Sequence, residues 1–478
     1  MFEQCPKRLW LAIDRPELAQ FDEGAQGRFD NGHKVGELAC ALHPEGVMVG
    51  AEPDLVAALE QTAHLLSDGH PGPIFEATFS HEGVLIRADI LEGHGANAWR
   101  LAEVKSSTGA KDYHLGDLAT QLWVIGEAGV SVSAAVIRHV NRDFVLEREG
   151  DYRGLFADAD LLDEADILAL ERPALVAAAR KVLAGAEPER DLGDHCNVPF
   201  PCEFSAHCSR ALPSGPEWPV EILPNGAWKK WAKKGVVDLL ELDETTMPKP
   251  REALIVAATR TGVPYHDREG GRVAMAQWGW PRAWLDFETI SPAVPLWLGT
   301  RPYGQIPFQF SLHLEQEDGS MSHHEFLCCD GSDPRPGCAA ALVEAIPPEA
   351  TVIAYNAGFE RSVLRALAQQ IRQHAAALSA MAERTVDLLP ITRENWYHRD
   401  QRGSWSIKAV LPTIAAELDY AALEVKDGGM AQESFLEASD PATSPERRWA
   451  LEEALKAYCA RDTWAMVVVA RRLAGEGD

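Results

Sequence analysis

Two carboxylates near the middle of the chain have a spacing that suits a metal site. Asp286 and Glu288 stand two residues apart among the apolar residues Trp284, Leu285 and Phe287. This pattern predicts a buried strand, and on a strand two residues at this spacing project from the same face. Two such carboxylates repel each other unless a cation lies between them. The alternative is an edge strand whose acidic face is solvated.

Further acids follow in elements that can bring them to this strand. Glu360 lies just after a predicted strand at 351–355, where a helix begins. Tyr458 and Asp462 are at i and i+4 of a predicted helix at 446–472 and therefore share one helix face. Two divalent ions held by such carboxylates stabilise the attacking and the leaving oxygen in phosphodiester hydrolysis. We expect Mg²⁺ or Mn²⁺, because hard cations prefer carboxylate oxygens.

The first half of the chain carries a second set of residues that can do this chemistry. Asp89 lies on a predicted strand at 84–91, and Glu103 and Lys105 end another at 99–105. Carboxylates on neighbouring strands can hold a divalent metal. A lysine beside them can orient or deprotonate water, or neutralise charge on a scissile phosphate. The alternative is a cross-strand ion pair on a half-exposed sheet.

Three of the nine cysteines are clustered, at Cys196, Cys202 and Cys208. Zinc sites usually pair cysteines two to four residues apart, so this spacing is a poor zinc signature. A 4Fe–4S cluster needs four thiolates, and Cys5 is the natural fourth ligand. We therefore expect an iron–sulfur cluster, with zinc and free thiols as the alternatives.

The elements that position these residues predict an α/β protein. Strands are expected at 74–79, 84–91, 99–105, 131–140, 306–315, 321–328 and 351–355, and helices at 115–125, 156–186, 226–242, 251–262, 336–346 and 446–472. Prolines between 213 and 250 mark a connecting segment. The predicted organisation is a first domain at 1–212, a helical connector at 213–280 and a second domain at 281–478.

The N-terminal motifs resemble those of the RecB-type P-D-(D/E)-x-K nucleases. The likeness is closest to the CRISPR-associated and AddB-like branch, which carries an iron–sulfur cluster. It implies a restriction-endonuclease-like mixed sheet flanked by helices, with Asp89 and Glu103 binding the metal and Lys105 assisting catalysis. It also implies that Gln121 contacts substrate, and that one cysteine before the nuclease core and three after it hold a 4Fe–4S cluster.

The C-terminal motifs resemble those of the DEDD exonucleases of the ribonuclease H-like (DnaQ) class. The likeness implies a ribonuclease H-like mixed sheet with helices, in which Asp286, Glu288, Glu360 and Asp462 bind two divalent ions. Tyr458 would position or activate the attacking water. Glu360 departs from the family, because most members carry Asp there. Asn356 is expected to contact substrate or cap the helix, and Lys408 to meet phosphate unless it is a surface lysine.

The whole chain resembles bacterial proteins that join a RecB-like nuclease to a C-terminal domain of unknown function. Arg393, Arg399 and Arg402 are expected to extend a phosphate track. The net charge of −27 argues against a nucleic-acid partner. However, carboxylates that bind metal ions account for part of this negative charge, and a groove for phosphates needs only local positive potential.

The predicted function is a metal-dependent nuclease, most simply an exonuclease, with DNA favoured over RNA as the substrate. The alternatives are an RNA-processing 3′→5′ exonuclease, and a nucleic-acid-binding scaffold with one or both sites degenerate. No apolar run spans a membrane and no signal-peptide pattern is present, so the expectation is a cytoplasmic protein without a membrane partner.

Overall fold

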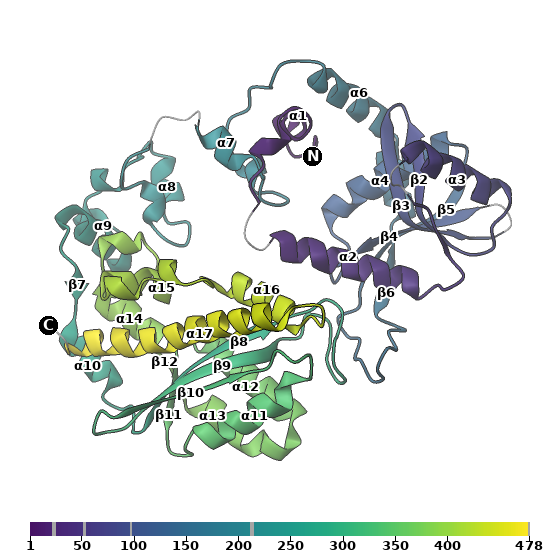
Figure 1. Ribbon diagram of the computed structural model, residues 1–478. Coiled ribbons are helices and arrows are strands. Elements are labelled where there is room, and N and C mark those ends of the chain that lie inside the picture. The colour runs from purple at the N-terminus through teal and green to yellow at the C-terminus, as the bar shows by residue number, and fades with distance from the viewer. Residues whose placement is uncertain (22–24, 51–53, 96–97, 211–214, 477–478) are drawn as a thin grey trace. The chain divides into compact units, whose positions relative to one another are not determined.

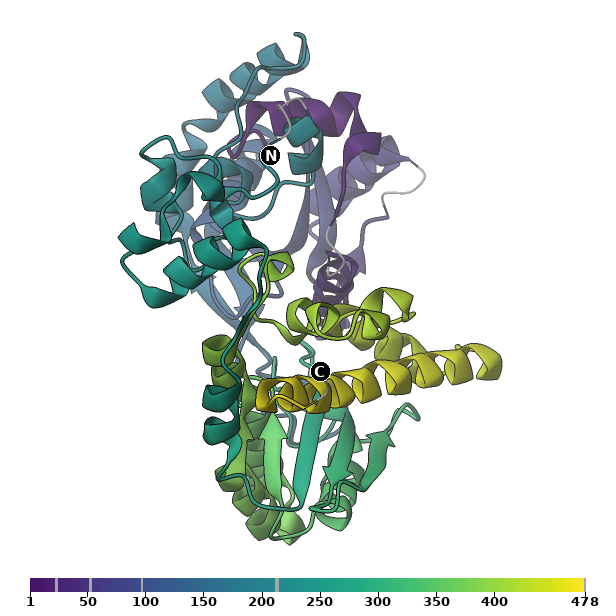
Figure 2. The same cartoon turned by 90° about the vertical axis from the view of Figure 1, so that its left-hand side faces the viewer.

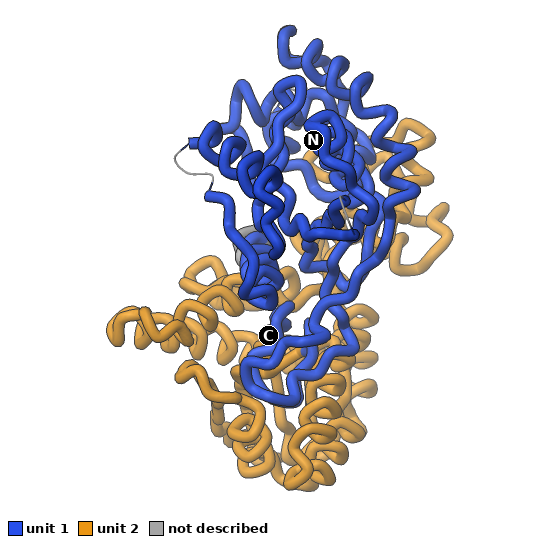
Figure 3. Tube along the Cα trace, turned by 90° about the vertical axis from the view of Figure 1, so that its right-hand side faces the viewer, with its two compact units in different colours: residues 1–212, 291–304 blue, residues 213–290, 305–478 orange. Residues whose placement is uncertain are grey.

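The computed structural model of the protein describes residues 1–21, 25–50, 54–95, 98–210 and 215–476. Both helices and strands occur throughout the chain and form mixed sheets with helices (Figure 1), so the α/β class predicted from the sequence is confirmed. The chain forms two units, coloured separately in Figure 3. The first comprises residues 1–212 and 291–304, and the second comprises residues 213–290 and 305–478. Within the described ranges, no helix is long and apolar enough to cross a membrane.

The first unit is a six-stranded sheet with helices on both faces. The strands run in the order β1-β2-β3-β4-β5-β6; β2, β3 and β4 are antiparallel neighbours, and β4 and β5 are parallel. The elements are α1 (Pro6–Asp14), α2 (Ala25–Ala41), β1 (Val47–Met48), α3 (Leu55–Ser67), β2 (Ile74–His81), β3 (Val84–Gly93), β4 (Trp99–Lys105), α4 (Asp112–Glu127), β5 (Val132–Val140), β6 (Phe156–Asp160), α5 (Leu162–Ala169), α6 (Arg172–Leu183) and α7 (Ser205–Arg210).

Alternation along β4 decides which face carries the polar residues of this strand. Leu101 packs in the cluster that contains Leu118 and Leu122 of α4, whereas Ala102 packs with Ala39 of α2. Glu103 shares the face of Leu101, because side chains alternate along a strand. It is therefore turned toward α4.

The second unit has a five-stranded sheet in the order β10-β9-β8-β11-β12. Strands β8, β9 and β10 are antiparallel neighbours, and β11 lies parallel to both β8 and β12. The elements are α8 (Lys229–Ala232), α9 (Pro250–Thr261), β7 (Tyr265–His266), α10 (Arg268–Met275), β8 (Arg282–Ile290), β9 (Ile306–Glu315), β10 (Met321–Leu327), α11 (Pro334–Ala345), β11 (Thr351–Ala354), α12 (Gly358–Gln370), α13 (Ala375–Arg384), β12 (Thr385–Asp387), α14 (Leu388–Asn395), β13 (Trp396–Tyr397), α15 (Ile407–Val410), α16 (Gly428–Ser439) and α17 (Pro445–Ala474).

Different helices cover the two faces of this sheet. Figure 2 shows the long helix α17 lying across it. On β8, Ala283, Leu285 and Phe287 pack into a cluster with α11, α12 and α13, whereas Trp284 packs into a cluster with Met466 of α17. Asp286 and Glu288 alternate along the strand with Leu285 and Phe287, so they project from the opposite face, which α17 covers.

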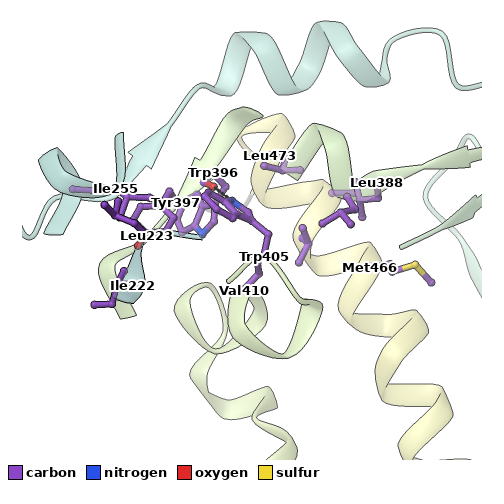
Figure 4. Close-up of a cluster of buried hydrophobic side chains, with 14 of the residues drawn as sticks. Ile222, Leu223, Ile255, Leu388, Trp396, Tyr397, Trp405, Val410, Met466 and Leu473 are labelled. Atoms are coloured by element: carbon purple, nitrogen blue, oxygen red, sulfur yellow. Dashed lines mark hydrogen bonds between the residues drawn. The ribbon is translucent and has the colours of Figure 1, made fainter. Parts of the chain in front are cut away.

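The segment at 213–280, which the sequence presents as a connector, belongs to the core of the second unit. Leu223 and Ile255 of this segment are buried in one cluster with Trp396, Tyr397 and Trp405 (Figure 4). Apolar burial of this extent is the dominant source of folding free energy, so α9 is fixed to the second unit.

The segment at 291–304 joins the first unit, although the sequence assigns it to the second domain. Its Thr300 O accepts a backbone hydrogen bond from Leu146 N at 3.1 Å, and Tyr152 Oη donates to Pro295 O at 3.1 Å. The Tyr303 hydroxyl donates to Ser106 O, immediately after β4. Ala293 is buried with residues of the first unit.

Candidate functional sites

Three carboxylates converge where β8 meets α17. One ligand oxygen from each of Asp286, Glu288 and Asp462 lies within 4.8 Å of the other two. Among the described residues, no other group of three or more potential metal ligands meets this limit. Glu288 and Asp462 are buried and Asp286 is half-buried. The donors are carboxylate oxygens, which fits a hard divalent cation such as Mg²⁺.

Burial and mutual repulsion disfavour the charged forms of these acids. Burial, with the charge of Asp462 next, raises the pKa of Asp286 well above its ordinary value and that of Glu288 to about 8. Burial also raises the pKa of Asp462 to about 6. The charge of Lys408 lowers the pKa of all three acids but does not offset these effects, and a cation placed among the acids would relieve the remaining repulsion.

Two tyrosines and a lysine complete the second-unit site. Lys408 Nζ donates to Tyr458 Oη at 2.9 Å and to Lys426 O at 2.8 Å. Tyr420 Oη donates to Asp462 Oδ1 at 2.5 Å. Tyr458 lines one cavity with the three acids, and Lys408, which lines the same cavity, is half-buried and is not a solvated surface lysine. Tyr420 was missed because it lies in a single 3₁₀ turn at Tyr420–Ala422, where neither periodicity nor motif singles it out.

Glu360 lies near the three acids but outside their close group. It is 3% exposed near the start of α12, and its Oε2 has no hydrogen-bond partner. Burial raises the pKa of Glu360 to about 8, and its charge contributes to the raised pKa of Asp286. Burying a carboxylate oxygen without a hydrogen-bond partner costs free energy, and a bound cation or a hydrogen-bond donor would remove this cost.

Asn356 adopts a left-handed backbone conformation, with φ of +69°, and is exposed. Its N–H donates to Asp387 Oδ1 at 3.0 Å, and the same oxygen accepts from Leu389 N at 3.0 Å to cap α14. Asn356 does not cap α12, whose N-cap residue is Ala357. Asp387 therefore holds the turn after β11, and the side chain of Asn356 lines a cavity.

The candidate residues of the first unit lie close together across β3, β4 and α4. Asp89 Oδ2 accepts from Val104 N at 2.7 Å, and Glu103 Oε1 pairs with Lys105 Nζ at 2.8 Å. Gln121 Nε2 donates to Glu103 Oε2 at 2.6 Å. Gln121, expected to contact substrate, is buried and orients Glu103 instead.

The electrostatics of this first-unit site resemble those of the other. Burial and the charge of Glu103 raise the pKa of Asp89 to about 8. Burial is the largest single influence on the pKa of Lys105 and lowers it, but the charge and hydrogen bond of Glu103, together with the charges of Asp117 and Asp89, raise it by more, so the net shift is upward. Lys105 therefore remains a cation beside the carboxylates, which suits it to neutralise phosphate charge.

The four cysteines expected to bind a cluster line one cavity. Cys5 precedes α1, and Cys196, Cys202 and Cys208 come from the last part of the first unit; all four are thiols without disulfides. Tetrahedral zinc, with Zn–S bonds of about 2.3 Å, brings its sulfurs to about 3.8 Å of one another. No three of these described thiols lie within 4.8 Å of one another. The four thiols therefore do not form a compact tetrahedral zinc site in this structure.

The arginines expected to form a phosphate track divide into two kinds. Arg399 and Arg402 lie over the ring of Trp218, at 5.4 and 5.5 Å from its centroid. They hold the segment at 213–280 and line none of the cavities described below. Arg393 is exposed and lines two of those cavities.

Residues 283–406 match a family described as "Domain of unknown function (DUF2779)". "Uncharacterized protein MG366 homolog" of Mycoplasma pneumoniae is 29% identical over 216 residues, which cover 39% of this chain and 31% of that protein. The chain thus matches less than a third of the length of this relative. No solved structure matches. The family match includes Asp286, Glu288 and Glu360 but ends before Tyr458 and Asp462.

Proposed function

We propose that the protein is a divalent-metal-dependent nuclease that hydrolyses phosphodiester bonds, with an exonuclease site in the second unit. The convergence of Asp286, Glu288 and Asp462 oxygens within 4.8 Å carries this proposal. Three carboxylates held against their own repulsion are the ligand set for Mg²⁺ or Mn²⁺. The sheet order, with the two acids on central β8 and the third on α17, supports a ribonuclease H-like domain of the DEDD type.

Divalent ions at this site would stabilise charge on the attacking and leaving oxygens of the phosphodiester. The chain's own contribution follows from its hydrogen bonds. Because Lys408 donates to Tyr458 Oη, the phenol proton must point to another acceptor, a carboxylate or an oxygen of substrate. Tyr458 is thereby suited to hold an attacking water, and Lys408 brings a positive charge to a cavity of about 200 Å³ lined by the three acids.

The first unit supports a second nuclease site of the RecB type. Asp89 and Glu103 supply carboxylate oxygens, Lys105 supplies a cation 2.8 Å from Glu103, and Gln121 fixes the Glu103 carboxylate. The order of strands and helices around β2–β5, with α4 between the parallel strands β4 and β5, is compatible with a restriction-endonuclease-like domain.

The cavity lined by Cys5, Cys196, Cys202 and Cys208 would hold a 4Fe–4S cluster. Four thiols with no three within zinc-binding range suit four separate irons. Such a group would join α1 to residues 196–208. The Arg8–Glu203 ion pair, at 2.9 Å, already connects these two segments.

The proposal is tested with the purified full chain and 5′-labelled single-stranded oligonucleotides in Mg²⁺ or Mn²⁺. We expect a ladder of products shortened from one end, with no products in EDTA. If neither DNA nor RNA is cut with any divalent metal, the enzyme proposal is rejected. Tight binding without cleavage would then favour a nucleic-acid scaffold, and preference for a matched RNA would favour RNA processing.

A further inference from the structure

Three cavities of the second unit are neighbours, because they share lining residues. The cavity of the three acids shares Tyr355 and Ile407 with a second cavity of about 520 Å³. The second shares Arg251 and Arg393 with a third of about 820 Å³. The three cavities therefore lie next to one another in a row that leads from the acids, past Tyr355 and the two arginines, toward Lys249 and Tyr265, and this row is called the groove here.

The two arginines at the middle of this groove are not neutralised by the protein. Both are exposed, and neither forms an ion pair with a carboxylate anywhere in the described ranges. Two acids line the third cavity with them: Glu244 pairs instead with Arg260 at 2.6 Å, and Glu394 is exposed. In a chain with a net charge of −27, two unpaired guanidinium groups converging on one groove favour a polyanionic ligand.

The positions of these arginines are set by packed structure. Arg251 lies in the first turn of α9, which is anchored by buried Ile255 (Figure 4). Its guanidinium is 5.6 Å from the centroid of the Trp405 ring, and Trp405 O accepts from Tyr355 Oη at 2.7 Å. The cation–π contact with Trp405 and the core packing of α9 thus hold the positive charge of Arg251 in the cavity that Tyr355 also lines. Tyr355 in turn lines the cavity of the acids.

We propose that this groove binds a single-stranded polynucleotide, with Arg251 and Arg393 contacting backbone phosphates upstream of the bond that the three acids address. This inference rests on the proposed function, because it names the substrate path of the same site. The half-buried rings of Tyr355 and Tyr265 offer stacking surfaces between charged contacts, the combination that single-strand binders use. Cavities of this size hold molecules on the scale of one or a few nucleotides of a single strand.

The test measures binding separately from cleavage. Full-length Asp286→Asn protein is titrated with fluorescent oligothymidylates of increasing length, and anisotropy is followed at several salt concentrations. Arg251→Ala and Arg393→Ala, each added to this background, should weaken binding of the longer strands about tenfold. Each should also reduce the slope of log affinity against log salt by about 0.7. Arg272→Ala, an exposed arginine of α10 outside the groove, is the matched control and should change neither quantity.

The outcomes distinguish failure of the groove from failure of the enzyme. Unchanged affinity and salt slope in both arginine variants would overturn the groove, even if the wild type cuts nucleic acid. Arginine-dependent binding together with an inactive wild type would uphold the groove and reject the nuclease. Equal competition by a duplex, or affinity that does not grow beyond a mononucleotide, would also overturn it.

Discussion

Tyr420 Oη donates a hydrogen bond of 2.5 Å to Asp462 Oδ1, and the tyrosine is 4% exposed. The bond fixes the orientation of a candidate metal ligand from a separate element. We expect Tyr420→Phe to keep the fold and to weaken Mn²⁺ binding about tenfold or more, because groups that orient metal ligands tune affinity by this amount. Calorimetric titration of Mn²⁺ provides the measurement. Tyr152→Phe, which loses a tyrosine hydrogen bond in the first unit, is the control, and an equal loss in both variants would contradict a specific role.

The two nuclease sites can be separated by one substitution in each. Asp286→Asn should reduce degradation from a strand end by at least about a hundredfold, because it removes a ligand oxygen at the proposed catalytic metals. Lys105→Ala should leave that activity intact. It should abolish any cleavage, of ends or of internal bonds, that the Asp286→Asn variant retains. Lys181→Ala, an exposed lysine of α6, controls for loss of charge. If Lys105→Ala eliminates all cleavage and Asp286→Asn none, the second unit has only a binding role.

Metal removal should destabilise the second unit. In EDTA the three carboxylates are buried together with Lys408 as the nearby positive charge, whereas Mg²⁺ binds only the folded arrangement and stabilises it by mass action. We expect the Tm of the wild type to rise on adding Mg²⁺, and this rise to disappear in Asp462→Asn. The variant should also be the more stable protein in EDTA, since it carries one charge fewer in the site. Equal Mg²⁺ dependence in the two proteins would show that the ion binds elsewhere.

A half-buried histidine, His313, predicts how stability depends on pH. His313 Nδ1 lies 2.8 Å from Thr463 Oγ1, and burial, aided by the charge of His323, lowers its pKa to about 4. Between its unfolded pKa of about 6.5 and about 4, the unfolded chain binds a proton that the folded chain does not. The contribution of neutral His313 to the free energy of unfolding is therefore complete above about pH 6.5. It is lost as the pH falls toward about 4, and the loss is at most about 3 kcal/mol.

Urea unfolding of the wild type and of His313→Gln between pH 4 and 7 measures this effect. The variant should have a flatter acid limb, because glutamine does not titrate. His324→Gln, an exposed histidine on the neighbouring strand β10, should retain the wild-type slope. A slope that is the same in all three proteins would assign the acid sensitivity to other groups.

The cysteine cavity makes a spectroscopic prediction. Protein purified without oxygen should absorb broadly near about 400 nm and contain about four irons per chain, as thiolate-bound clusters do. Cys202→Ser should lose both signals. Cys40→Ser, a half-buried cysteine outside the cavity, should keep them. If the protein contains stoichiometric zinc and no iron, the cluster proposal is rejected and the cysteines form a zinc site.

Local patterns were sufficient for several strands of the two sheets. Strands 99–105 and 306–315 are predicted with the bounds of β4 and β9, because alternation and apolar content act at short range. Spacing alone also places Asp286 and Glu288 on one face, and Tyr458 and Asp462 on another. The meeting of these two faces depends on packing between β8 and α17, which are about 170 residues apart in the sequence. The order of the motifs indicated this contact, and periodicity could not.

The discrepancies arise where tertiary contacts override composition. Residues 156–186 are rich in alanine and leucine and read as helical, yet Phe156–Asp160 forms strand β6 because it pairs with β5. Only Lys229–Ala232 of the expected helix at 226–242 is α-helical. Arg251 was not singled out as functional, because nothing local distinguishes an arginine that faces a groove from one that pairs with a neighbour.

The assignment of residues 291–304 to the first unit has a topological consequence. The chain passes between the units three times, after residues 212, 290 and 304. One cut between the units therefore cannot release either of them, since two covalent links remain. Neither unit can be expressed as an unbroken stretch of sequence without losing part of itself or borrowing part of the other. The strand that carries Asp286 and Glu288 ends at Ile290, directly before the second of these crossings.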